Sequence, residues 1–196
     1  MKKYVTYGII GVVLLFLSMS GCSKFNNMAV KEETVESATG NLQAQYQRRM
    51  DLIPNLVGIV ESYANFEKSA LTDITNARAS ATQVKIDPTN LKSLQQFDAA
   101  QAQVSSSLSR LMVVMEKYPD LKANEQFIGL QAEVAGTENR ITISRNDFNE
   151  TVQAYNKYIK QFPSNLWAKL FGYSKKEYFQ ADANAKYAPK IKMDIK

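Results

Sequence analysis

The side chains best placed to do chemistry in this sequence are charged residues that interrupt apolar, helically spaced patterns. Arg49, Glu67 and Arg78 fall on one such pattern, and Glu138 and Arg145 fall on another. Because an unpaired buried charge is costly, we expect these five residues to meet one another inside a bundle of helices. They predict either a structural ion-pair layer that sets helix register or the lining of a polar pocket, and the structural layer is favoured.

Three glutamates with apolar neighbours form the basis of an enzyme hypothesis, namely Glu67, Glu116 and Glu138. Two carboxyl groups on either side of a substrate act as general acid and base in glycosidases, so the enzyme alternative is a carboxylate-dependent hydrolase. Nothing in the sequence sets the separation of these acids. We therefore assign no catalytic residue and predict a protein that is not an enzyme.

The chain of 196 residues contains no histidine and one cysteine. The first absence excludes histidine-activated nucleophiles, imidazole zinc ligands and the Glu-x-x-His pairs of di-iron bundles. A single cysteine excludes an internal disulfide and a Cys-x-x-Cys redox pair. Gly129 and Gly136 are isolated and lack the Lys-Ser/Thr that completes a phosphate loop. The sequence thus predicts no metal and no cofactor.

The net charge is +5, from 24 lysines and arginines against 19 aspartates and glutamates. Before residue 169 the basic residues are scattered among acidic ones, whereas a nucleic-acid-binding surface clusters them with stacking aromatics. We therefore expect no nucleic-acid partner.

The N-terminus has the pattern of an export signal. Lys2 and Lys3 precede an uncharged stretch from Tyr4 to Gly21, and Met19-Ser20-Gly21-Cys22 resembles a bacterial lipobox. Cys22 would then carry lipid. The alternative is an uncleaved transmembrane anchor, since the uncharged stretch is just long enough to span a bilayer. In both cases the positive charges stay inside, which predicts a bundle outside the cytoplasm, on the cell membrane or, for a sorted lipoprotein, on the outer membrane.

Three long segments then follow a helical period, separated by proline-containing turns. The first runs from Glu32 to about Val84, with a kink or break expected at Pro54 and Asp51 as a cap. The second opens at Asp87-Pro88, and the third runs from Asp120 to Phe162. We predict an all-α, antiparallel up-and-down bundle of three to four long helices over residues 32–163, joined to residues 1–22 by a tether at 23–31.

The C-terminal part, residues 164–196, is predicted to hold a short amphipathic helix and a basic tail. The helix runs from Ser164 to Phe171 and ends at Gly172. Aromatic residues gather around it, including Trp167, Phe171 and Tyr173. They predict either an apolar plug that closes one end of the bundle or an exposed docking surface for a partner or the bilayer.

Two long motifs give the chain a family resemblance. Arg49 to Val57 reads RMDLIPNLV, and Glu116 to Asn124 reads EKYPDLKAN. With their surroundings, from about Leu42 to Phe179, they resemble the LemA family of bacterial membrane-anchored proteins. The resemblance implies a four-helix up-and-down bundle of the bromodomain-like type with an N-terminal anchor, and it implies no enzymatic activity or ligand. The cysteine-ending signal departs from the plain anchor common in the family.

Taken together, these patterns predict a non-enzymatic, membrane-anchored envelope protein. Its partners would be the bilayer, through the N-terminus, and an envelope protein of unknown identity that docks on the bundle.

Overall fold

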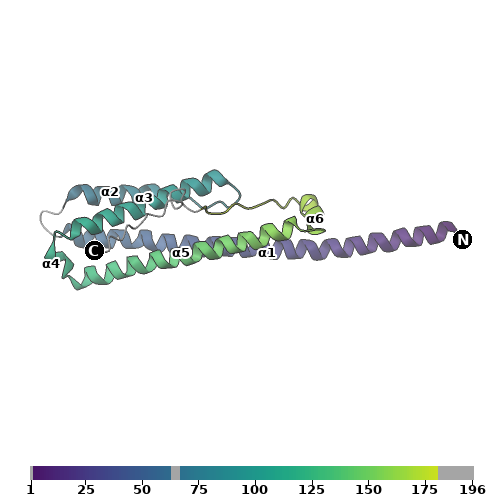
Figure 1. Cartoon of the computed structure of the whole chain (residues 1–196), viewed down its shortest axis with the longest axis horizontal. Coiled ribbons are helices and arrows are strands. Elements are labelled where there is room, and N and C mark those ends of the chain that lie inside the picture. Colours follow the sequence, from purple (N-terminus) through teal and green to yellow (C-terminus); the bar gives the residue numbers. More distant parts are fainter. Residues whose placement is uncertain (1, 63–66, 181–196) are drawn as a thin grey trace, which may run out of the picture.

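The computed structural model describes residues 2–62 and 67–180, and every regular element within them is a helix. Successive long helices run in opposite directions, as Figure 1 shows, so the predicted all-α, up-and-down bundle is confirmed. The helices are α1 (Lys2–Glu61), α2 (Lys68–Ala81), α3 (Leu91–Met115), α4 (Pro119–Lys122), α5 (Glu125–Lys160) and α6 (Ser164–Phe171).

Helices α1 and α5 form the spine of the molecule, and the hairpin of α2 and α3 packs on it (Figure 1). Helix α1 has 60 residues, which corresponds to about 90 Å at the rise of an α-helix. Its N-terminal part extends well beyond the other helices, past the end of the bundle where α6 lies.

The break predicted near Pro54 is wrong, because α1 continues through this residue to Glu61. A proline inside a helix costs about 3 kcal/mol, since it removes a hydrogen bond and crowds the preceding turn. Here the neighbouring side chains are deeply buried, and each buried aliphatic side chain contributes about 1.5–3 kcal/mol. Burial therefore outweighs the proline and keeps the helix intact; the buried neighbours are Leu52, Ile53 and Leu56.

The cap predicted at Asp51 is wrong. Asp51 lies inside α1, where it accepts a hydrogen bond from the Gln47 side chain. Helix α3 is capped by Asn90 and α5 by Asn124, whose side chains accept hydrogen bonds from backbone N–H groups of the first turn. Asp87 instead accepts hydrogen bonds from Thr89, which lower the pKa of its carboxyl group.

Residues 23–31, predicted as a tether, are a continuous part of α1. Met28 within them is fully buried. The connection between the bundle and the N-terminal residues is therefore a packed helix rather than a flexible link.

The apolar core consists of two clusters along the long axis. One lies towards α4 and includes Met50, Leu56, Leu108, Leu111 and Phe127, and the other lies towards α6 and includes Leu42, Tyr46, Phe97, Ile141 and Phe148. On each of α1, α3 and α5 a polar residue lies between the buried members of the two clusters: Arg49, Gln101 and Glu138. A polar layer thus divides the core.

At the far end, α6 ends at Gly172 as predicted, because this glycine adopts a positive φ of 79° that terminates a helix. The chain then returns along the bundle in an extended conformation as far as Gln180. The rest of the predicted basic tail, residues 181–196, lies outside the described residues, as do most side chains of the predicted signal or anchor at 1–22. Among the described residues, no helix combines the length and apolar content needed to cross a membrane.

The buried Met28 gives a test of the helical connection. We expect Met28→Ala to lower the free energy of unfolding by about 2–5 kcal/mol, the usual cost of truncating a buried methionine. Val30→Ala is the matched control, because Val30 is 66% exposed two residues away and its truncation is expected to cost little. Urea unfolding followed by circular dichroism measures both, and equal effects of the two substitutions would contradict the packed connection.

Candidate functional site

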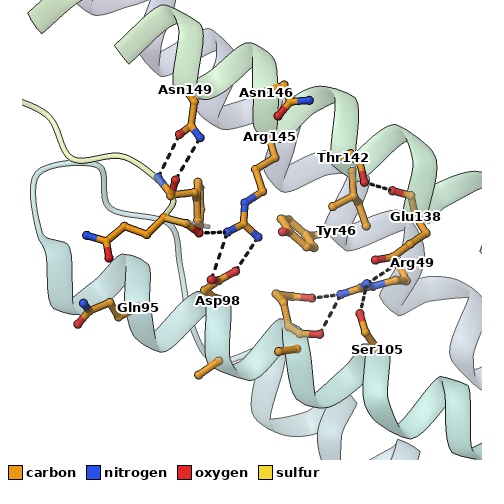
Figure 2. Close-up of a pocket in the computed structure, with 16 residues that line it drawn as sticks. Tyr46, Arg49, Gln95, Asp98, Ser105, Glu138, Thr142, Arg145, Asn146 and Asn149 are labelled. Atoms are coloured by element: carbon orange, nitrogen blue, oxygen red, sulfur yellow. Dashed lines mark hydrogen bonds and ion pairs between the residues drawn. The ribbon is translucent and has the colours of Figure 1, made fainter. Parts of the chain in front are cut away.

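A groove of about 760 Å³ lies between α1, α3 and α5 at the level of the polar layer (Figure 2). Its walls mix charged, amide and aromatic side chains, and the extended segment after α6 closes one end. The labelled lining residues are Tyr46, Arg49, Gln95, Asp98, Ser105, Glu138, Thr142, Arg145, Asn146 and Asn149.

Arg49 is the hub of this groove, with only 1% of its surface exposed. Its Nη1 donates to Glu138 Oε2 at 2.6 Å and to Ser105 Oγ at 2.9 Å. Its Nη2 donates to the side-chain and backbone oxygens of Gln101, at 2.6 and 3.3 Å. The guanidinium of α1 is therefore bonded to α3 and α5 at once, and its Nε is buried without a hydrogen-bond partner in the described structure.

A second arginine forms a clasp across the groove. Both terminal nitrogens of Arg145 on α5 donate to the Asp98 carboxylate on α3, at 2.8 and 3.2 Å. One of them also donates to the backbone oxygen of Gln180. The guanidinium lies 4.8 Å from the centre of the Phe179 ring, within cation–π range. Arg145 thus ties α3, α5 and the extended segment together.

Two asparagines on α5 bind the extended segment through its backbone. Asn149 donates to Phe179 O and accepts from Phe179 N, at 3.1 and 3.0 Å. Asn156 makes the same two bonds with Lys176, at 2.8 and 2.9 Å. Residues seven apart lie on one face of a helix. This face of α5 therefore holds an extended polypeptide by its main-chain groups.

Two buried tyrosines near this segment are held in their neutral form. Burial raises the pKa of Tyr46, although the positive charges of Arg145 and Arg49 oppose the shift. Burial, with smaller contributions from Glu32 and Tyr173, raises the pKa of Tyr155 to about 12. The Tyr155 hydroxyl donates to the backbone oxygen of Ser174 and so fixes the start of the extended segment.

Of the five residues predicted to form an ion-pair layer, only Arg49 and Glu138 pair with each other. Arg145 lies in the same groove but pairs with Asp98. Arg78 donates to the backbone oxygen of Met50 in the apolar cluster. Glu67 is exposed at the start of α2, 3.8 Å from Arg110.

The three glutamates of the hydrolase hypothesis are not brought together. Glu116 is exposed just after α3 and pairs with Lys122, and Glu67 faces Arg110. Only Glu138 lines the groove. Across the described ranges, no group of three or more aspartate, glutamate or cysteine side chains is arranged to hold a metal ion.

The predicted aromatic surface packs partly against α1. Trp167 stacks on Phe171, with ring centres 5.8 Å apart, and Phe25 contacts Phe171 edge to face at 5.1 Å. The Tyr173 ring also lies 6.0 Å from Phe25. The Trp167 ring sits so close to Gly21 that a Cβ there would come within 3.0 Å of it. One side of this cluster lines an apolar hollow of about 340 Å³. Cys22, whose free thiol is exposed, is also part of the lining.

The sequence reasoning missed Asp98, Gln101, Asn149 and Asn156. Gln101 was visible as a polar residue on the apolar stripe of its helix, and the seven-residue spacing of the two asparagines was visible as well. Neither pattern indicates a partner, because these partners are an arginine on another helix and the backbone of a distant segment.

These features define a class of protein: an elongated helical bundle with a polar groove along its side and an extended segment bound to α5 at one end of that groove. Comparison with known proteins narrows the class, since the sequence profile of the LemA family matches residues 38–193. The chain belongs to the LemA family.

Three relatives are similar at low identity. The chain is 24% identical over 176 residues to Magnetosome protein MamQ 1 of Paramagnetospirillum magneticum, covering 80% of this chain and 65% of that protein. It is 25% identical over 156 residues to Protein LemA of Metamycoplasma hominis, covering 80% and 68%. Magnetosome protein MamQ of Magnetospirillum gryphiswaldense is 22% identical over 175 residues, covering 80% and 64%. The chain thus spans about two thirds of the length of these relatives.

Substitutions of Arg49 and its neighbour Arg48 test whether Arg49 holds three helices together. We expect Arg49→Lys to lower the free energy of unfolding by about 1.5–3 kcal/mol, because lysine lacks the planar fork that reaches two other helices. Arg48→Lys is the control, since Arg48 makes one exposed ion pair with Glu133 worth at most about 1 kcal/mol. Denaturant unfolding of both variants measures the difference, and similar losses would argue against the hub.

Tyr155 gives a pH test. Its pKa is raised from 10.0 to about 12 in the folded state, so its contribution to stability is present below pH 10 and is lost as pH rises towards 12. We expect Tyr155→Phe to be less stable at neutral pH, by about 1 kcal/mol for the lost hydrogen bond, and the gap to the wild type to narrow above pH 10. Thermal melts across this range check it, with Tyr4→Phe, at an exposed position, as the control. A stability difference between the wild type and Tyr155→Phe that stays constant with pH would contradict the raised pKa of Tyr155.

Proposed function

We propose that this LemA-family chain is a non-enzymatic, membrane-anchored scaffold of the cell envelope that docks a partner protein outside the cytoplasm. The docking site is the groove between α1, α3 and α5, and the part of the partner that docks is an extended segment of polypeptide. The observation that carries the proposal is the pairing of Asn149 and Asn156 with the backbone of an extended segment.

The groove continues the track of that segment along α5. Where Phe179 and Gln180 end the described chain, the lining goes on along the same helix with Asn146 and Thr142. The exposed Asn146 amide can bond a main chain regardless of its side chains, and the Thr142 hydroxyl, which donates to Glu138 O, can still accept a hydrogen bond.

The charges in the groove support binding rather than acid–base catalysis. Its two carboxylates are Asp98 and Glu138, and each is held by an arginine at 2.8 Å or less. An acid that donates a proton to a substrate has to be free to reach it in the right protonation state. Both carboxylates are instead committed as acceptors, so the arrangement does not favour the hydrolase alternative.

The N-terminal sequence supports the anchor and its side of the membrane. Lys2 and Lys3 precede the uncharged stretch, and α1 carries this stretch beyond the end of the bundle (Figure 1). Cys22 at its end is exposed and so accessible for lipid attachment. Mass spectrometry of the mature N-terminus distinguishes a lipidated Cys22 from an uncleaved anchor.

The docking proposal is tested by site-specific photo-crosslinking in the native cell envelope. A photoreactive amino acid replaces Gln95 or Asn146, which are exposed and line the groove from α3 and α5. We expect a discrete adduct heavier than the chain, because a docked segment would lie within reach of both positions.

Gln103 and Gln126 are the matched control positions, since they are exposed on the same two helices and do not line the groove. They should yield no such adduct. Crosslinks formed only within the chain, or equally at all four positions, would overturn the docking proposal.

A further inference from the structure

The end of the bundle around α6 exposes an apolar face that no described part of the chain covers. Leu166 and Leu170 are 59% and 70% exposed, and Phe162 just before the helix is 81% exposed. Leu166 and Leu170 are four residues apart and so share one face of α6, whereas Ser164 and Ala168 are buried on the opposite face. The helix therefore packs on the bundle with one face and exposes apolar side chains on the opposite face.

Lysines predominate at the same end of the molecule. Residues 21–31 of α1 and residues 153–172 of α5 and α6 contain five lysines and no aspartate or glutamate. These segments lie together, because Lys24 and Lys31 of α1 both lie within 6 Å of the Tyr158 ring of α5. Lys157, Lys160 and Lys169 are exposed beside them.

This end is also where the chain leaves the bundle towards its N-terminus. Trp167 and Phe171 of α6 line a common hollow with Gly21, Cys22 and Phe25 of α1, and the uncharged stretch from Tyr4 ends at Gly21. From there α1 continues beyond the bundle towards the N-terminus (Figure 1). A lipid on Cys22 and a transmembrane anchor ending at Gly21 would both place α6 at the level of the membrane surface.

From these three observations we infer that α6 lies on the bilayer surface, with Phe162, Leu166 and Leu170 inserted among the lipids and the surrounding lysines facing anionic headgroups. Exposed apolar side chains beside lysines are the pattern of interfacial helices, whose binding combines apolar burial with attraction to anionic lipid. The inference rests on the membrane anchoring of the proposed function and adds a second contact, which fixes how the bundle stands on the membrane.

The chain contains a single tryptophan, Trp167 in α6, and its fluorescence reports on this contact directly. The full chain is reconstituted in vesicles of phosphatidylcholine and phosphatidylglycerol whose acyl chains are brominated close to the headgroup. Flotation of the vesicles shows whether the chain is anchored, and bromine quenching shows whether α6 contacts the lipids. We expect flotation together with strong quenching, and weaker quenching in vesicles without phosphatidylglycerol.

Substitutions separate the two contacts. Leu166→Glu with Leu170→Glu should remove most of the quenching while the chain still floats, because the anchor is untouched. Ile128→Glu with Ile143→Glu is the control, since these residues are exposed on α5 outside the basic end. Lys160→Gln with Lys169→Gln should remove the dependence on phosphatidylglycerol, and Lys68→Gln with Lys92→Gln should leave it unchanged. Circular dichroism confirms that each variant keeps its helical content.

The outcomes are distinguishable. A chain that floats with Trp167 unquenched, or quenched equally in the Leu166 and Leu170 variant, would overturn the inference and assign this face to a protein partner, leaving the anchor in place. A chain that does not float would overturn the anchoring itself and, with it, this placement of α6.

Discussion

The buried guanidinium of Arg49 constrains the whole bundle. A cation this deeply buried needs acceptors, and Ser105, Gln101 and Glu138 supply them from two other helices. Sliding α3 or α5 by one turn along α1 would move these acceptors about 5.4 Å away and leave the charge unpaired. The layer therefore sets helix register, much as a polar residue does in a coiled coil. These polar side chains lie between α3 and α5 but do not fill the space, so a groove remains there. Apolar side chains would instead pack to the density of a protein interior.

The fold was predictable because helical periodicity and turn residues act locally. The bounds of α6 follow from Pro163 and Gly172 alone, and the pairing of the buried Arg49 with the exposed Glu138 follows from two charges on apolar stripes. Predictions failed where contacts between helices determine the local structure or the partner of a charge. Burial around Pro54 keeps α1 continuous, and the partner of Arg145 is Asp98, which lies next to the apolar Phe97 rather than on the stripe itself. The asparagine pairs were beyond sequence reasoning, since their partner is the backbone of an extended segment with no periodicity of its own.

The two sites lie at different levels of one spine. From Gly21, beside α6, to Arg49 in the groove, α1 advances 28 residues, or about 42 Å at the helical rise. A folded helix paired with α5 maintains this separation, whereas a flexible chain of the same length would allow a wide range of distances. The length of α1 thus sets how far the groove stands from the end that carries the lysines and the exposed face of α6.

The continuity of α1 connects its N-terminal part mechanically to the groove, and this matters for the proposed anchoring. With a flexible tether at residues 23–31, the groove would take every orientation relative to the membrane, and a docking partner held in the envelope would meet it at random. The buried Met28, the aromatic packing of Phe25 on Phe171 and the close approach of Trp167 to Gly21 instead hold the start of the bundle rigidly on α1. Binding to a pre-oriented site avoids part of the entropy that ordering would cost. The proposed docking role would therefore depend on a helical junction, which the packing of α6 against α1 supports.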